Sequence, residues 1–175
     1  MRLLFEIDKK DYNKNGTSFV RPSVRGIIIK DGKIAMVHSL KYDYYKFPGG
    51  GIKAGEEHRE TLLREVKEET GLRVCPDSVK EYGLVHRIQK GMKEDMFIQD
   101  NYYYFCDAEN DVEEQELDDY EAEEKFTLEF VTPQYAIDVN KTSISIVAEQ
   151  VNEVYSIMLE RDSRILEILM EEGYC

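Results

Sequence analysis

Residues 50–72 read GGIKAGEEHRETLLREVKEETGL, and this stretch, from Gly50 to Leu72, decides the fold of the chain. It opens as a glycine-rich turn directly after Pro48. Residues 57–70 are mostly strong helix formers and contain no proline. Gly71 follows at the point where helices commonly end on a left-handed residue. The stretch therefore predicts a tight loop followed by a helix over about residues 57–70.

The carboxylates of this predicted helix gather on one face. Glu65, Glu68 and Glu69 are related by i, i+3 and i+4 spacing, whereas Leu62 and Val66 form a separate apolar stripe. Like charges at this spacing repel and weaken an isolated helix. A solvated acidic face is one interpretation of the pattern. A site for a hard cation such as Mg²⁺ is the other, because Mg²⁺ takes oxygen ligands.

The spacing of the fixed residues decides between these interpretations. Gly50 is followed after five residues by Glu56 and, after seven more, by Arg64-Glu65-Val66-Lys67-Glu68-Glu69-Thr70-Gly71-Leu72. This pattern resembles the Nudix box of the Nudix hydrolase family at every defining position. A chance match at one starting point is on the order of 10⁻⁹. The stretch is therefore interpreted as a Nudix box.

The resemblance implies a set of functional residues. The metal ligands would be the Gly49 carbonyl and the side chains of Glu65, Glu68 and Glu69, with Glu65 also the favoured general base. The cofactor would be Mg²⁺, with Mn²⁺ as a second candidate. Arg64 is expected to hold the carboxylates in place by pairing with Glu56, Glu60 or Glu68. The residues that support the motif are Gly50, Glu56, Arg64 and Gly71.

Further candidates lie outside the box. Glu129-Phe130-Val131 resembles a late segment of the family, which often carries an extra metal-binding or base Glu a few residues upstream. Glu124 is the best positional match for that residue, with Glu123 and Glu121 behind it. Three substrate contacts are also expected, each with a structural alternative. They are Arg25 for phosphate (or an ion pair), and Tyr45 and Phe47 for a nucleobase (or packing on the sheet).

The composition restricts the class of protein. The chain has 175 residues and a net charge of −13, and residues 107–124 hold eleven Asp and Glu with no Lys or Arg. This balance predicts no binding of nucleic acid or anionic membranes, so an anionic substrate would have to enter through bound cations. No apolar run is long enough for a membrane span, and three cysteines without CxxC spacing suggest no disulfide framework. We therefore expect a reduced, cytoplasmic protein.

The remaining elements follow from β-rich runs and turns. Residues 24–29 and 34–37 predict a hairpin around Asp31-Gly32. The acidic run 107–124 predicts a solvated loop, and residues 142–172 predict one long or two consecutive helices with a break at 161–163. Their apolar stripe would pack on the sheet or form a homodimer contact. The other expected strands are residues 2–7, 72–74, 82–88, 96–106 and 126–132, with a helix near 134–139.

Together these features predict an α/β protein with the Nudix α/β/α sandwich, a mixed sheet between helices. It would form one domain over residues 1–175, with an N-terminal extension (1–20) and C-terminal helices (141–175). The expected activity is Mg²⁺-dependent hydrolysis of a phosphoanhydride in a nucleoside diphosphate linked to another group. A nucleoside triphosphate, either unmodified or oxidised, and ADP-ribose are the leading small-molecule substrates. The alternatives are a non-catalytic ligand-sensing Nudix module and an isopentenyl diphosphate isomerase-like enzyme using Cys75 or Cys106.

Overall fold

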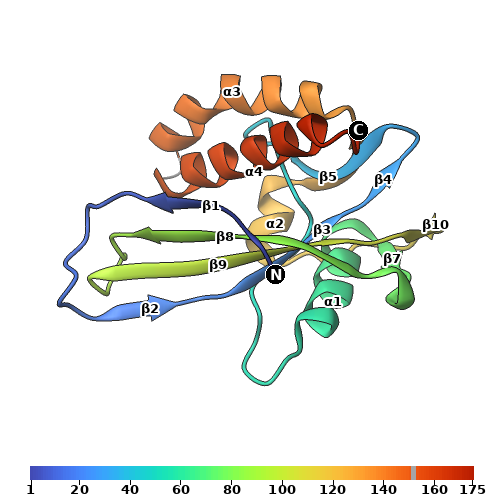
Figure 1. Cartoon of the computed structure of the whole chain (residues 1–175). Helices are drawn as coiled ribbons and strands as arrows, with labels where there is room; N and C mark the ends of the chain where they lie inside the picture. The colour runs from blue at the N-terminus through green and yellow to red at the C-terminus, as the bar shows by residue number, and fades with distance from the viewer. Residues whose placement is uncertain (151–152) are drawn as a thin grey trace.

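The computed structural model describes residues 1–150 and 153–175, without the side chains at positions 147, 150, 153 and 154. Its elements form layers (Figure 1). Helices α3 (Pro133–Gln150) and α4 (Glu153–Glu171) cover one side of the strands, and α1 (His58–Thr70) lies on the other. The predicted α/β sandwich with a C-terminal helical segment is confirmed.

The larger sheet is mixed. Strands β8 and β9 are antiparallel to each other, whereas β1 runs parallel to β8, and β2 and β3 both run parallel to β9. The predicted strand near the N-terminus is β1, which joins this sheet instead of standing apart from it. The strands are β1 (Leu3–Asp8), β2 (Ser18–Val20), β3 (Ser23–Ile27), β8 (Lys80–Gln89) and β9 (Met96–Phe105).

A second sheet contains the predicted hairpin. Asp31 and Gly32 both have positive φ, 52° and 71°, as a two-residue turn of the I′ type requires. The predicted first strand of the hairpin is divided into β3 and β4. Of these two strands, β3 pairs with β9 in the larger sheet, and β4 pairs with β5 in the second sheet. The strands are β4 (Ile29–Lys30), β5 (Lys33–Ser39), β6 (Tyr44–Lys46) and β11 (Phe126–Val131).

Helix α1 has the boundaries that its sequence predicts. Glu57 is the N-cap and forms a capping box with Glu60, which satisfies backbone donors of the first turn. Leu62 and Val66 are fully buried in a cluster with Val24 of β3 and other core residues. Burial of this apolar stripe fixes which face of α1 carries the carboxylates.

The acidic run is more ordered than its composition predicts. Its first part forms β10 (Ala108–Val112), which pairs with β7 (Leu72–Val74). A short 3₁₀ turn (Pro76–Ser78) follows β7 in the chain. The last part of the acidic run forms α2 (Asp119–Glu124). The prediction of a solvated loop is wrong for both parts. Between them, Glu113 N donates to Gly71 O (2.8 Å) and Glu116 N to Glu68 O (2.9 Å). The backbone of the run thus satisfies carbonyls at the end of α1, a role that side-chain chemistry does not reveal.

The predicted break at residues 161–163 is wrong. Arg161, Asp162 and Ser163 lie inside α4 and are buried. Asp162 does not cap its own helix, because its carboxylate accepts hydrogen bonds from Phe47 N and Tyr103 Oη. As described, α3 extends to Gln150 and α4 starts from Glu153. Residues 151–152 lie outside the described residues, as do the side chains at positions 147 and 154 of the predicted apolar stripe.

The C-terminal helices pack on the sheet, as one of the two alternatives predicted. Ile165, Leu166 and Leu169 of α4 are fully buried in one core cluster with Phe5 of β1 and Tyr103 of β9. Among the described helices, none is both long and apolar enough to cross a membrane.

Replacing Gly71 by alanine should destabilise the protein more than the same change at Gly173. Both glycines follow a helix with φ near +75°, so each substitution carries the left-handed penalty of about 1–2 kcal/mol. An added Cβ at Gly71 would lie 2.1 Å from Glu113 O, whereas an added Cβ at Gly173 would have no neighbouring atom of the described structure within 4 Å. We expect G71A to lose at least about 1 kcal/mol more in urea unfolding. Equal losses for the two variants would contradict the close contact between the acidic run and α1.

Candidate functional site

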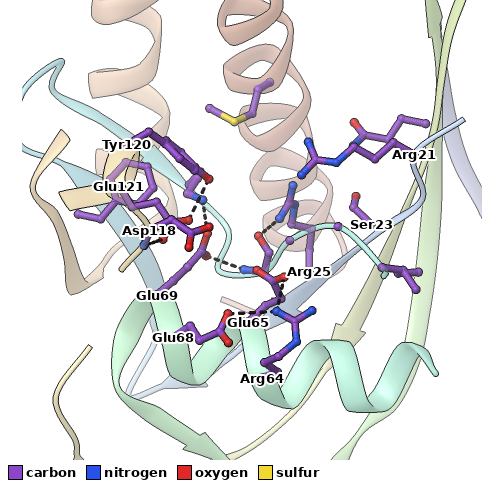
Figure 2. Close-up of a pocket in the computed structure, with 18 of the residues that line it drawn as sticks. Arg21, Ser23, Arg25, Arg64, Glu65, Glu68, Glu69, Asp118, Tyr120 and Glu121 are labelled. Atoms are coloured by element: carbon purple, nitrogen blue, oxygen red, sulfur yellow. Dashed lines mark hydrogen bonds and ion pairs between the residues drawn. The ribbon is translucent and has the colours of Figure 1, made fainter. Parts of the chain in front are cut away.

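A cavity of about 620 Å³ lies against the glycine-rich turn and the C-terminal half of α1 (Figure 2). Its walls come from segments that are distant in sequence: the turn after β6, β3, β8, β9, the α2 segment and α4. All three clustered glutamates of α1 line it, and so do Gly49 and Gly50. The structure therefore brings the predicted metal-binding residues to one wall.

The glycine-rich turn fits closely between β3 and α1. Gly49 has φ 134°, and a Cβ there would lie 2.2 Å from Val24 O. A Cβ at Gly50 would lie 2.0 Å from Glu65 Oε2. A side chain at Gly49 would push the turn away from β3, and one at Gly50 would displace the Glu65 carboxylate. Glycine at both positions therefore lets the turn lie close to β3 and to the carboxylates.

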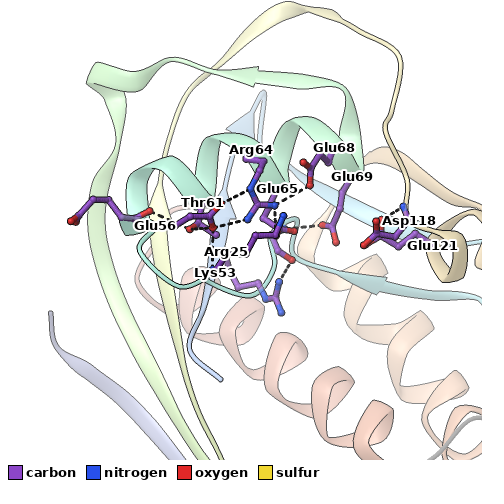
Figure 3. Close-up of polar contacts among 12 residues, drawn as sticks. Arg25, Lys53, Glu56, Thr61, Arg64, Glu65, Glu68, Glu69, Asp118 and Glu121 are labelled. Carbon is purple, nitrogen blue, oxygen red and sulfur yellow. Dashed lines mark hydrogen bonds and ion pairs between the residues drawn. The ribbon is translucent and has the colours of Figure 1, made fainter. Parts of the chain in front are cut away.

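Arg64 organises the exposed part of the carboxylate row (Figure 3). Its guanidinium binds Glu56 through two nearly parallel hydrogen bonds of 2.9 and 2.8 Å, which lower the pKa of Glu56 to about 2. Its Nη1 donates to Glu65 (2.6 Å) and Glu68 (3.0 Å). The predicted pairing with Glu56 and Glu68 is observed, whereas Glu60 serves the capping box.

Glu69 is the buried member of the row, with 2% of its surface exposed. It accepts hydrogen bonds from Lys46 Nζ and from Gly49 N (2.8 Å). Burial raises the pKa of Glu69, while the neighbouring charges of Lys46 and Arg25 oppose that shift. Lys46 is itself buried at the end of β6, so this ion pair fastens α1 to the second sheet.

Arg25 lines the cavity and donates to the Gly49 carbonyl, the same oxygen that is expected to bind metal. Burial, followed by the nearby charge of Arg161, lowers the pKa of Arg25. Its observed contact is with the protein backbone, whereas the structural alternative that was predicted, an ion pair, is not seen among the described residues. A contact between Arg25 and phosphate stays a prediction.

The two predicted aromatic contacts lie in the core and not on the cavity wall. The Tyr45 ring is 1% exposed, stacks on His38 at 4.3 Å and donates to Glu129 (2.7 Å). Phe47 is fully buried and meets Tyr103 edge to face at 5.5 Å. Packing is the alternative that the structure supports for both rings, because neither can reach a bound nucleobase without leaving the core.

Among the upstream acids, the structure favours a different residue from the one the position predicts. Glu124 does not line the cavity, because its carboxylate accepts hydrogen bonds from Ser39 (2.9 Å), Tyr44 (2.6 Å) and Tyr155 (3.3 Å). Glu123 forms an exposed ion pair elsewhere. Glu121 lines the cavity and lies beside Asp118, across from the α1 carboxylates (Figure 3). The sequence could not separate these acids because it did not predict α2.

Basic residues of the cavity were missed by the sequence analysis. Arg87 is the clearest case, because residues 85, 87 and 89 alternate as the buried face of β8. An arginine on the buried face of a predicted strand was the available signal. Arg161 gave no such signal, since it was assigned to a break between helices. The basic residues that line the cavity are Arg21, Arg25, Lys46, Lys53, Arg64, Arg87 and Arg161.

The donor set suits a hard divalent cation, because it consists of carboxylates and a backbone carbonyl. Among the described residues, however, no three His, Cys, Asp or Glu side chains converge closely enough to hold a metal as they stand. Three protein cations explain this: Lys46 holds Glu69, Arg64 holds Glu65 and Glu68, and Arg25 holds the Gly49 carbonyl. A metal would fit here once these oxygens turn away from their protein partners.

Comparison with known proteins agrees with the fold and the box. The family model described as NUDIX domain matches residues 20–149. The chain therefore belongs to the NUDIX family, whose members are hydrolases that generally use divalent metals.

Two curated relatives match the segment around the box. An RNA pyrophosphohydrolase of Hydrogenovibrio crunogenus is 39% identical over 64 residues, and an ADP-ribose pyrophosphatase of Methanocaldococcus jannaschii is 38% identical over 71 residues. The matches cover 36% and 38% of this chain, and 38% and 41% of the relatives. They support an enzyme that hydrolyses pyrophosphate bonds in general.

Solved structures support the fold. A NUDIX hydrolase from Nitrosomonas europaea has a TM-score of 0.54 at 16% identity, covering 70% of this chain and 79% of its own. A MutT NUDIX hydrolase from Burkholderia pseudomallei has a TM-score of 0.51 at 16% identity, covering 66% and 85%. At this identity the likeness concerns the fold alone.

Replacing Lys46 by methionine should test the buried ion pair. The change leaves the Glu69 carboxylate buried without its cation, so we expect a loss of about 3–5 kcal/mol in unfolding free energy. The matched control is Lys41→Met, which removes an exposed pair with Glu123 and should cost about 1 kcal/mol or less. Both are measured by urea unfolding in EDTA.

Metal should then restore part of the lost stability. With Lys46 gone, a divalent cation no longer competes with an ammonium for Glu69, so Mn²⁺ should raise the Tm of K46M more than that of wild type. An equal or smaller rise would contradict the idea that Lys46 occupies a metal-binding carboxylate.

Proposed function

We propose that this chain hydrolyses a phosphoanhydride bond in a nucleoside diphosphate linked to another group, with Mg²⁺ as its cofactor. The observation that carries the proposal is the placement of the complete carboxylate row, Glu65, Glu68 and Glu69, on one wall of a cavity that also presents guanidinium groups. The names of the two relatives, a pyrophosphohydrolase and a pyrophosphatase, support the reaction class.

The metal would be held by the Gly49 carbonyl and by the three α1 carboxylates. Mg²⁺ suits these hard oxygen donors, and Mn²⁺ is the second candidate. When bound, such a cation neutralises charge on the phosphate oxygens and increases the acidity of coordinated water. The donor residues are Gly49, Glu65, Glu68 and Glu69.

The protein groups supply positioning and proton transfer. Glu65 accepts the proton of the water that attacks phosphorus in line with the leaving oxygen. Arg64 keeps Glu65 aimed into the cavity, because the guanidinium is itself fixed by two hydrogen bonds to Glu56. Glu121 takes the place predicted for Glu124 as the second acid, since its side chain lines the cavity. Guanidinium groups of the wall stabilise the negative charge of the phosphates.

The substrate is proposed to be a small nucleotide-type molecule, with nucleoside triphosphates and ADP-ribose as the first choices. The RNA pyrophosphohydrolase relative adds RNA carrying a 5′-triphosphate to the compounds that deserve a test, against the expectation of no nucleic-acid binding. An aromatic partner for a base exists on the cavity wall in Tyr120, which is half exposed.

The isomerase alternative finds no support in the geometry. That chemistry needs a cysteine, and neither Cys75 nor Cys106 lines the cavity. Burial raises the pKa of the Cys106 thiol to about 12, so it is protonated at neutral pH. A ligand-sensing module without catalysis is separated from the hydrolase by measuring turnover.

Turnover should depend on both metal and Glu65. We would measure phosphate or nucleotide release from nucleoside triphosphates, ADP-ribose, dinucleoside polyphosphates, NADH and 5′-triphosphorylated RNA, each with Mg²⁺ and with EDTA. Glu65→Gln should lower kcat by several orders of magnitude, at least about 10²-fold, because it removes the proposed base and one ligand.

The matched control is Glu60→Gln, on the same helix but outside the cavity. Gln keeps the capping box at this position, so E60Q should retain wild-type activity. Activity of E65Q within tenfold of wild type would refute the role of Glu65. No metal-dependent turnover of any compound by the folded wild type would favour the sensing module.

A further inference from the structure

One part of the cavity wall is formed by buried arginines that the proposed metal chemistry does not use. Arg87 comes from β8, Arg161 from α4 and Arg25 from β3, and the charge of Arg161 acts on both of the others. Their exposed fractions are 3%, 2% and 8%, yet all three line the cavity. We call these three residues the arginine cluster. Burying like charges together is costly unless an anion compensates them.

The carboxylates near Arg25 and Arg161 only partly compensate the charge of these two residues. Asp162 pairs with Arg161 (Nε to Oδ1, 2.8 Å) and also accepts hydrogen bonds from Phe47 N and Tyr103 Oη. Glu69 acts on Arg25 through its charge, but it is already paired with Lys46. Arg25 and Arg161 thus share one full carboxylate and part of a second.

Donors of the cluster are also left over. Arg161 Nη1 donates to Asn101 Oδ1 (2.6 Å), but within the described part of the chain its Nη2 has no hydrogen-bond partner, and neither has Arg25 Nε. Unpaired buried donors are costly, and more so when they are charged. Burial and the charge of Arg161 lower the pKa of Arg87 to about 9, so Arg87 stays protonated at neutral pH.

We propose that the arginine cluster binds a phosphate group of the substrate other than the anhydride that is hydrolysed. The inference rests on the proposed function, because it names a substrate feature for the same cavity. Arginine forks match phosphate oxygens in geometry and charge, and they bind them more strongly in a desolvated site. The exposed Arg21 lines the cavity as a further donor (Figure 2).

This assignment narrows the substrate class. It favours compounds with a third phosphate in the chain, or with a phosphate on the ribose of the nucleoside, over NADH or plain ADP-ribose. Arg161 lies on α4, beyond the residues that match the family model, so the subsite depends on a helix outside the matched domain.

The first test is the binding of inorganic triphosphate to the full chain in EDTA, measured by calorimetry. Wild type should bind, and Arg87→Met should weaken binding at least about tenfold, the effect of losing one charged hydrogen bond. The control is Arg164→Met, which removes an exposed guanidinium from α4 that stacks on Phe5 (4.1 Å) outside the cavity. It should bind as wild type does.

The proposal is overturned if folded wild type shows no binding at millimolar triphosphate, or if R87M binds as tightly as wild type. Should R87M fail to fold, Arg21→Gln replaces it, because that side chain is exposed and its loss leaves the core intact. R21Q should weaken triphosphate binding by several-fold, and unchanged binding would count against the site.

Kinetic comparisons identify which phosphate is bound and separate this proposal from the proposed function. A preference for nucleoside triphosphates over diphosphates indicates a phosphate in the chain, and a preference for NADPH over NADH indicates a phosphate on the ribose of the nucleoside. In either case R87M should raise KM for the preferred compound and leave KM for the other unchanged. Hydrolysis without triphosphate binding would overturn the arginine site alone. Binding without hydrolysis of any compound would support the site and overturn the proposed hydrolase.

Discussion

The buried ion pair between Glu69 and Lys46 is the interaction on which the rest of the site depends. Glu69 is 2% exposed and is held by the ammonium of Lys46 and by Gly49 N. The pair joins three parts of the fold: helix α1, strand β6 and the glycine-rich turn. Because a buried charge without a partner is strongly destabilising, it fixes the position of the turn against the helix. The remaining carboxylates then fall on the same cavity wall.

A helix with three clustered carboxylates needs cations, and in this chain the protein provides them. Arg64 holds Glu65 and Glu68, and Arg25 holds the Gly49 carbonyl. These partners prevent the like charges from separating, so the donor atoms remain near one another without a metal. Binding of a divalent cation would exchange one set of partners for another. This exchange explains how the site can be folded without a metal and still need one for activity.

The sequence predicted the parts whose pattern is local. The box specified α1, its end at Gly71 and the row of glutamates, because helical periodicity and glycine conformations are properties of neighbouring residues. Prediction from the sequence failed where contacts between distant residues determine the structure. Strand β10 is held by backbone pairing with β7, which its acidic side chains do not reveal. Asp162 does not interrupt α4, because its carboxylate accepts hydrogen bonds from Tyr103 of β9 and from Phe47 N before the turn. Tyr45 and Phe47 were predicted as nucleobase contacts because they precede the glycine-rich turn, but their rings are buried in the core.

The most direct test of the account is a crystal structure with Mn²⁺, located by anomalous scattering. The account predicts Mn²⁺ within about 2.0–2.3 Å of oxygens from Gly49, Glu65, Glu68 and Glu69, with Arg25 displaced from the Gly49 carbonyl. A Mn²⁺ ion bound elsewhere would contradict it. So would a structure at saturating Mn²⁺ in which Lys46, Arg64 and Arg25 keep all their present partners.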